Sequence, residues 1–369
     1  MNHVWWDKIT NAHRFIDAIV NTALVGSSVI LTLPQQIPWF DTLYTYIKEE
    51  LENQDSVKSF IDLSSPKQDV GKFLLNQFCT EEQRIQYRPS QSCAVFLGQC
   101  RSTVLNDHYV WVEDIPRDLW KDWIDFLTEY HANMCSNRSP AVFFLVCTED
   151  GVQISPRRNV SCFNYRQQIH EYDYFSFCML AASSSALGAS NNKTALRSYL
   201  AELTYALCGN DIELCAACIA TGRRFLEKPE ETLHLIMRTQ RRSDGVSFFC
   251  NTSPEAVSRK IWEAQIKTVF PCIEHFRQQF IDNYTKEIQS LLPMKGSDLE
   301  EIHEPLDVEL GLLFYMVRGC LLQVSTEEYK QLEMFREARN LLAHLKPLSL
   351  PMIEKIYQIT EIGTKKPAL

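Results

Sequence analysis

The sequence predicts an α/β region over residues 1–180, a small helical module over 190–250 and an all-α bundle over 251–369. Two observations lead to this fold class. In the first 150 residues, short β-branched apolar runs alternate with amphipathic helical segments, which is typical of a parallel sheet covered by helices. From residue 251 onward, long stretches with helical periodicity are joined by short connections, as in a helix bundle.

The elements of the N-terminal region are predicted from apolar periodicity and from the residues that end each run. Gly26 follows the first helical pattern at the position of a left-handed cap, and Pro34 ends the first strand-like run. Because helical segments separate the strand-like runs, we expect parallel strands covered on both faces. The expected elements are a helix over 7–25, a strand over 28–33, a helix over 39–52, a strand over 109–112, a helix over 119–130 and a strand over 142–146.

Glu113 and Asp114 follow a buried strand-like run, and this order of elements resembles the nucleotide-binding core of AAA-like and signal-transducing ATPases. The resemblance implies a phosphate loop after the first strand. Residues 33–39 instead contain neither glycine nor lysine, and their two prolines lack the amide donors that phosphate requires. We therefore expect either a P-loop-like domain that lacks the phosphate loop and holds no nucleotide, or an unrelated α/β platform. For Glu113 and Asp114, a solvated turn is favoured over a metal site.

The middle of the chain predicts a winged-helix-like module that follows a loop or hinge over 181–190. Its expected elements are helices over 194–209, 211–227 and 229–240, a turn over 243–245 and a strand over 246–250. If this module binds nucleic acid, five arginines are the expected phosphate contacts: Arg223, Arg224, Arg238, Arg241 and Arg242. The favoured alternative is that these arginines are solvated or paired with acids.

Capping signals mark the helices of the C-terminal part. Ser253 followed by Pro254 is a typical helix start, and Pro271 is expected to bend the long helix that follows. Residues 325–328, Ser-Thr-Glu-Glu, match a capping box. The predicted bundle consists of a long helix from 254 to 291, a connection closed by Gly296, a helix over 306–322, a third helix from 325 and a fourth after Pro351.

The third of these helices carries Arg339-Asn340-Leu341-Leu342-Ala343-His344, which resembles the Arg-Asn-x-x-Ala-His motif of HEPN-domain proteins. These proteins are all-helical bundles common among prokaryotic toxins and phage-defence factors. In catalytic members the arginine and histidine cleave RNA without a metal, and two protomers usually combine their motifs into one site. The resemblance implies that Arg339 holds the scissile phosphate, that Asn340 orients the groups, and that His344 is the general acid or base.

The spacing of the motif bears on this hypothesis. Five residues separate Arg339 from His344, which places their side chains about 140° apart around an uninterrupted helix. A shared site therefore requires a homodimer or a local break in the helix. The alternative is a noncatalytic bundle, as in many family members, in which these side chains bond to carbonyls or to acids such as Glu337, Asp307 and Glu309.

Composition limits the other function classes. The net charge is −9, and residues 1–150 hold 12 basic against 20 acidic residues, which argues against a wide basic face for duplex nucleic acid. No apolar run is long enough to span a membrane, so we expect a cytoplasmic protein. The 13 cysteines are expected to be buried reduced thiols. Cys215 and Cys218 have the spacing of half a zinc site, but no second pair accompanies them, and no metal or cofactor is expected.

Two main functions follow. The first is a metal-independent RNA endonuclease in a prokaryotic defence system, regulated by the N-terminal domain, whose site is completed by a homodimer or by a local break in the helix. The second is a noncatalytic adaptor or sensor in a multi-protein phage-defence complex, which would bind a protein partner through the acidic, Trp- and Phe-rich N-terminal third. DNA binding through the middle arginines is a third hypothesis, and ATP hydrolysis is the least favoured.

Overall fold

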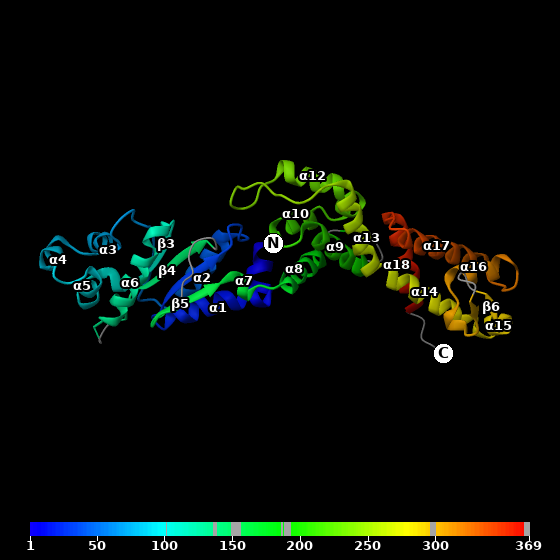
Figure 1. Cartoon of the computed structure of the whole chain (residues 1–369), viewed down its shortest axis with the longest axis horizontal. Coiled ribbons are helices and arrows are strands. Elements are labelled where there is room, and N and C mark those ends of the chain that lie inside the picture. Colours follow the sequence, from blue (N-terminus) through cyan, green and yellow to red (C-terminus); the bar gives the residue numbers. More distant parts are fainter. Residues whose placement is uncertain are drawn as a thin grey trace. The chain divides into compact units, whose positions relative to one another are not determined.

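The computed structural model describes residues 1–100, 102–135, 139–148, 156–185, 187, 193–295 and 300–364. It shows a mixed α/β protein that divides into two compact units, Met1–Asp173 and Tyr174–Leu369 (Figure 1). The first unit holds a five-stranded sheet, and the second is helical apart from a two-stranded hairpin. Among the described residues, no helix combines the length and the apolar character that crossing a membrane requires.

The sheet of the first unit is parallel throughout, as predicted. Its strand order is β2-β3-β4-β1-β5, so β1 lies between β4 and β5, and Ile30 pairs with both Leu145 and Cys162. The predicted strands β1, β3 and β4 are confirmed, whereas β2 and β5 were not predicted. The strands are β1 (Ser28–Leu33), β2 (Ser59–Ser64), β3 (His108–Glu113), β4 (Val142–Thr148) and β5 (Val160–Asn164).

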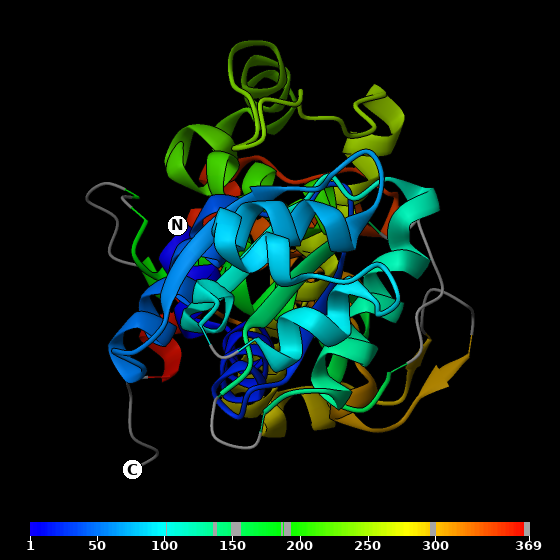
Figure 2. The same ribbon diagram turned by 90° about the vertical axis from the view of Figure 1, so that its left-hand side faces the viewer.

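Helices cover both faces of this sheet. One face packs against α3, α5 and α6 through a cluster that includes Val110, Phe143 and Trp123. On the other face, α1 packs against β1 and α2, and the Tyr44 ring of α2 contacts Trp111 of β3. Figure 2 shows the cyan helices with the strands behind them. The helical elements are a π-helical turn Val4–Lys8, α1 (Thr10–Leu24), α2 (Phe40–Gln54), α3 (Val70–Phe78), α4 (Glu81–Gln86), α5 (Cys93–Gln99), two 3₁₀ turns Val104–Asp107 and Arg117–Leu119, α6 (Trp120–Ala132) and α7 (Tyr165–Gln168).

Most aromatic side chains of this unit lie in its core. Five of its tryptophans are at most 4% exposed: Trp5, Trp6, Trp111, Trp120 and Trp123. Burial of these rings stabilises the fold, so they contribute to the core rather than to the exposed surface of the N-terminal third. Gly26 has a φ of 83° and caps α1, as predicted.

The second unit consists of helices in close contact. Helix α9 packs along α13, so the segment predicted as a separate middle module shares this unit with the C-terminal helices. The helices are α8 (Glu171–Ser183), α9 (Lys193–Cys208), α10 (Ile212–Ala220), α11 (Arg223–Glu227), α12 (Pro229–Thr239), α13 (Pro254–Thr268), α14 (Phe270–Asn283), α15 (Thr285–Leu291), the 3₁₀ turn Pro305–Asp307, α16 (Leu310–Arg318), α17 (Thr326–Ala343) and α18 (Leu350–Thr364). The hairpin strands are β6 (Met294–Lys295) and β7 (Glu301–Ile302).

Several predicted boundaries in this unit are confirmed and others are wrong. Ser253 caps α13 through the Ala256 amide, and Ser325 and Glu328 form the predicted capping box of α17. Instead of one bent helix, α13 ends at Thr268 and α14 begins with Pro271 in its first turn, since proline lacks an amide donor. The predicted helix 306–322 is shortened to α16. Gly296 lies outside the described residues, as do residues 186 and 188–190 of the predicted hinge, and the first part of that hinge is instead the end of α8 at Ser183.

The turn predicted over 243–245 is confirmed, whereas residues 246–250 do not form the predicted strand. Ser247 forms only an isolated antiparallel bridge with Arg241. Gly245 has a φ of 80°, and the Val246 amide donates to the Asp244 carboxylate over 2.9 Å. A glycine with a positive φ also divides the predicted helix 211–227. Gly222, with a φ of 56°, lies between α10 and α11.

Candidate functional site

The motif lies in the last turns of α17, which one apolar face holds against the unit. Phe335 stacks on Phe276 with ring centroids 3.9 Å apart, and Leu342 is fully buried. The indole nitrogen of Trp262 donates to the Leu342 carbonyl over 2.7 Å, which satisfies one of the free carbonyls at the helix end. The helix ends at Ala343, and His344 caps it. The opposite face of α17 therefore presents the polar residues to solvent.

Arg339 is half-buried beside acidic residues. Its guanidinium lies 3.5 Å from the Glu309 carboxylate and 3.4 Å from the side-chain oxygen of Asn340. It lines a depression of about 310 Å³ whose other charged residues are Glu274, Arg277, Asp307 and Glu309. Three carboxylates thus face two guanidiniums in this depression, as the noncatalytic alternative anticipated for Asp307 and Glu309.

Asn340 and the exposed His344 line a different depression of about 330 Å³. Its remaining charged residues are Glu333, Arg336, Glu337 and Lys346. The guanidinium of Arg336 lies over the Phe314 ring, 4.3 Å from its centroid. Arg336, Asn340 and His344 are spaced by four residues, so they follow one face of the helix. Arg336 was not among the predicted site residues, although its four-residue spacing from Asn340 is the signal that could have identified it.

The structure therefore brings His344 together with Asn340 and Arg336, but not with Arg339. This separation agrees with the angle expected from five residues of helix. Within one chain, the two groups with the catalytic roles implied by the resemblance open into separate depressions.

A larger groove of about 700 Å³ adjoins the depression of Arg339. Four carboxylates and one ammonium group are its charged lining, and Asp307 and Glu309 line both hollows. Its apolar lining includes the Tyr315 ring, which is 60% exposed. The groove residues are Met294, Lys295, Glu300, Glu301, Ile302, Asp307, Glu309, Gly311, Leu312 and Tyr315. The surface beside Arg339 is thus acidic and partly apolar.

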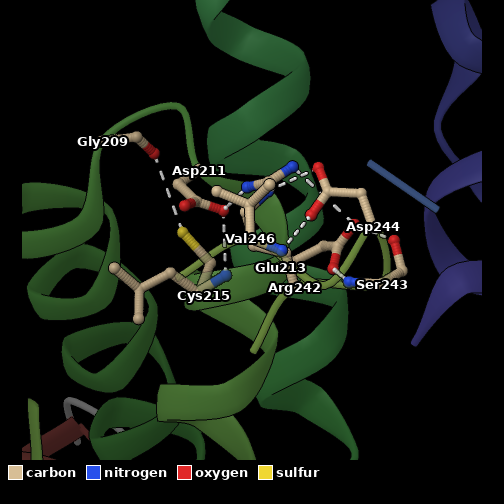
Figure 3. Close-up of polar contacts among 9 residues, drawn as sticks. Gly209, Asp211, Glu213, Cys215, Arg242, Ser243, Asp244 and Val246 are labelled. Atoms are coloured by element: carbon tan, nitrogen blue, oxygen red, sulfur yellow. Dashed lines mark hydrogen bonds and ion pairs between the residues drawn. The ribbon is translucent and has the colours of Figure 1, made fainter. Parts of the chain in front are cut away.

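Of the five middle arginines, Arg242 is the one that the structure removes from the nucleic-acid hypothesis. It is 4% exposed, and its guanidinium lies 2.6 Å from Asp211, 3.5 Å from Asp244 and 3.8 Å from Glu213. Glu213 also accepts hydrogen bonds of 2.6 Å from the amide and the hydroxyl of Ser243 (Figure 3). A buried guanidinium held by three acids is unavailable to a phosphate.

The other four arginines differ in their contacts. Arg223 makes a two-pronged ion pair with Glu354, at 2.5 and 3.1 Å, and contacts Glu227 at 2.8 Å. The hydrogen bond to Glu354 raises the pKa of Arg223 above its ordinary value. Arg241 donates to the Gln240 carbonyl over 2.8 Å. Arg224, Arg238 and Arg241 are exposed and are the arginines most accessible to a phosphate, whereas Arg223 is half-buried and already paired with acids.

The segment after β1, where an ATPase would carry its phosphate loop, has no glycine-rich sequence over residues 33–39. Residue Trp39 precedes α2 with a φ of 46°, and Asp114 follows β3 with a φ of 55°. The carboxylate of Glu113 accepts a hydrogen bond of 2.6 Å from the Trp111 indole. Among the residues that the structure describes, no group of three or more His, Cys, Asp or Glu side chains is arranged to hold a metal ion.

A comparison of the sequence with protein-family models finds no match, and a comparison with curated proteins finds none either. The function is therefore inferred from the residues of this chain.

Proposed function

We propose that the C-terminal helices are a noncatalytic docking unit through which the chain joins a multi-protein complex, as an adaptor or sensor in prokaryotic phage defence. One observation carries this proposal: Arg339 and His344 line separate depressions, and Arg339 contacts Glu309. Acid–base cleavage of RNA requires a phosphate held next to the group that moves the proton. One chain does not offer that arrangement at these two residues.

The charges around Arg339 support the same proposal. Surfaces that bind nucleic acid concentrate lysine and arginine, because phosphate contacts supply most of the affinity. The groove beside Arg339 instead has four carboxylates against the single ammonium group of Lys295. A basic segment of a protein partner complements this potential, and the exposed Leu306 and Tyr315 side chains provide apolar contact area. The partner is thus expected to carry basic and apolar residues together.

Charge reversal in the groove tests the docking proposal. The tagged full chain is purified from its native host, and the stoichiometry of the bound protein is measured for the wild type and for the Glu301→Lys and Asp307→Lys variants. Both substitutions should lower the bound fraction, whereas Arg339→Ala and His344→Ala should retain it. Glu255→Lys, an exposed change on α13 outside the three hollows, is the matched control. Equal binding by all variants would contradict docking at this groove.

A metal-independent ribonuclease is the second candidate. It is favoured by the open depression in which Asn340 and His344 lie beside Arg336, with Lys346 also in the lining. RNA supplies its own 2′-hydroxyl nucleophile, so a positioned cation and one proton-transfer group suffice for cleavage. In a homodimer, Arg339 of one protomer could complete the site at His344 of its partner.

Cleavage of RNA by the purified chain in EDTA separates the two functions. Cleavage that is lost in His344→Ala would refute the noncatalytic proposal, and cleavage that survives would place the activity elsewhere. An equimolar mixture of the Arg339→Ala and His344→Ala chains adds a test of the dimer. If two protomers share the site, the mixture regains activity that each variant lacks. Arg336→Ala then shows whether the arginine in the depression of His344 takes part.

The finer domain assignments belong to the same proposal. We infer that the sheet unit is a P-loop-like platform without a phosphate loop, that α9 to α12 form a winged-helix-like module, and that α13 to α18 form a HEPN-like bundle. The parallel sheet, the proline-containing segment after β1 and the motif at the end of α17 support these assignments. A nucleotide titration of the purified chain tests the first, since measurable ATP binding would contradict it.

A further inference from the structure

The core of the second unit contains a group of cysteine thiols. Cys208 is the last residue of α9, and Cys215 and Cys218 lie on α10. The sulfur atoms of Cys208 and Cys218 are 3.6 Å apart, whereas the Cys215 thiol donates to the Gly209 carbonyl over 3.7 Å. All thirteen cysteines of the chain are free thiols. The close pair therefore joins two helices and differs from the Cys-x-x-Cys pair that the sequence suggested.

The two members of this pair differ in exposure and acidity. Cys208 is 8% exposed and Cys218 is fully buried. Contacts with the Cys215 and Cys218 thiols lower the pKa of Cys208 below its ordinary value. Burial raises the pKa of Cys218 well above its ordinary value. The thiolate is the nucleophile in thiol chemistry, so Cys208 is suited to attack an oxidant and Cys218 is suited to attack the oxidised Cys208 sulfur.

We propose that Cys208 and Cys218 are a peroxide-sensitive pair that oxidation joins in a disulfide bond. The Cys208 thiolate attacks one peroxide oxygen, the O–O bond breaks, and hydroxide leaves as Cys208 becomes a sulfenic acid. The Cys218 sulfur then attacks the Cys208 sulfur, the S–O bond breaks, and the S–S bond forms. The Cys218 proton and the proton that Cys208 released on forming its thiolate combine with the two hydroxide ions to give water. In total, two thiols and one hydrogen peroxide give one disulfide and two water molecules.

The geometry allows this bond with a small movement. The sulfurs must approach from 3.6 Å to about 2.05 Å, a change within reach of side-chain rotation and a slight helix shift. The bridge would close the turn between α9 and α10, which contains Asp211 and directly precedes Glu213 in the first turn of α10. These two acids hold Arg242 in the network of Figure 3, and Asp211 also caps α10 by accepting from the Leu214 amide. Oxidation would therefore restrain the turn that anchors the segment around Arg242.

Mass spectrometry of the oxidised full chain tests the pairing. The reduced protein is treated with hydrogen peroxide, alkylated, and cleaved at glutamate residues without reductant. Cleavage after Glu213 separates Cys208 from Cys218, so the expected product is a pair of linked peptides that dithiothreitol releases. Cys320, which is exposed, shows that the peroxide reached the protein.

Three variants fix the assignment. Cys215→Ser should retain the linked peptides, whereas Cys208→Ser and Cys218→Ser should lose them while keeping the helical circular dichroism of the wild type. A bridge between Cys215 and Cys218 would overturn the proposal. Full alkylation of Cys208 and Cys218 after Cys320 has been oxidised would also overturn it, as would a Cys208 sulfinic acid without a bridge. The RNA cleavage and docking assays do not enter this test, so its outcome is independent of the proposed function.

Discussion

Arg242 offers the sharpest test of how charge is used in the second unit. Replacing it with alanine removes the cation from a site where the arginine and Glu213 are 4% and 5% exposed. Asp211, at 2.6 Å, would lose its closest ion pair. Breaking a buried pair from one side costs about 3–5 kcal/mol, because the remaining charges stay desolvated and uncompensated. For a unit of this size, the expected fall in Tm is roughly 6 to 20 °C.

Calorimetry of the full chain measures this change, with Arg223→Ala as the matched control. Arg223 also pairs with acids, but its side chain is 42% exposed, so its loss should cost only about 0–1 kcal/mol. The transition assigned to the second unit should therefore fall for Arg242→Ala and move little for Arg223→Ala. Equal shifts for the two variants would refute the assignment of Arg242 as a buried structural residue.

Three further predictions concern the fold. Burial lowers the pKa of His131 to about 4 in the folded protein. The free energy of unfolding should therefore be highest above pH 6.5 and should fall by about 3 kcal/mol as the pH drops toward 4. In urea titrations of His131→Gln, this fall in unfolding free energy should be absent. Gly98→Ala should destabilise the first unit by about 1–3 kcal/mol in the same titrations, because its Cβ would lie 3.0 Å from the Tyr130 carbonyl oxygen, and an unchanged midpoint would contradict this packing. Ser325→Ala should cost about 1 kcal/mol by removing the cap of α17, whereas Ser325→Asp should retain the cap.

The interior of the sheet could be predicted from sequence, but its edges could not. Strands β1, β3 and β4 are buried on both faces, so they occur as continuous apolar runs. Strands β2 and β5 have a neighbour on one side only and are largely half-buried or exposed. Their mixed sequences, such as Ser-Phe-Ile-Asp-Leu-Ser in β2, give no apolar run. The edge strands form because they pair with interior strands that are distant in sequence, and a local sequence pattern does not reveal such pairing.

In the helical unit, local signals were reliable where the chemistry is local. The caps at Ser253 and Ser325 depend on a side chain bonding an amide three residues away, and both were predicted. The strand expected over 246–250 depended on apolar content alone. Apolar content did not indicate that Gly245 turns the chain at a positive φ or that Arg242 is buried against Asp211 and Glu213 just before this segment.

The sequence predicted the relative directions of the motif side chains around α17, but not which other residues surround them. Helical spacing correctly indicated that Arg339 and His344 diverge within one chain. That Arg336 shares the depression of His344, and that the groove beside Arg339 is acidic, depends on how α16, the hairpin and α17 are assembled. The likeness of residues 339–344 to a known motif carries no information about the charges that surround it.

The position of β1 in the sheet has a consequence for biosynthesis. Val29 pairs with Phe144 on one side and Ser161 on the other, so both partners of this strand are translated long after it. At about 5–20 residues per second, roughly 5 to 20 s pass between the emergence of β1 and that of β4. During that interval a nascent chain presents an unpaired apolar strand at the ribosome. We therefore expect the yield of this protein to fall in cells that are depleted of chaperones able to shield that strand.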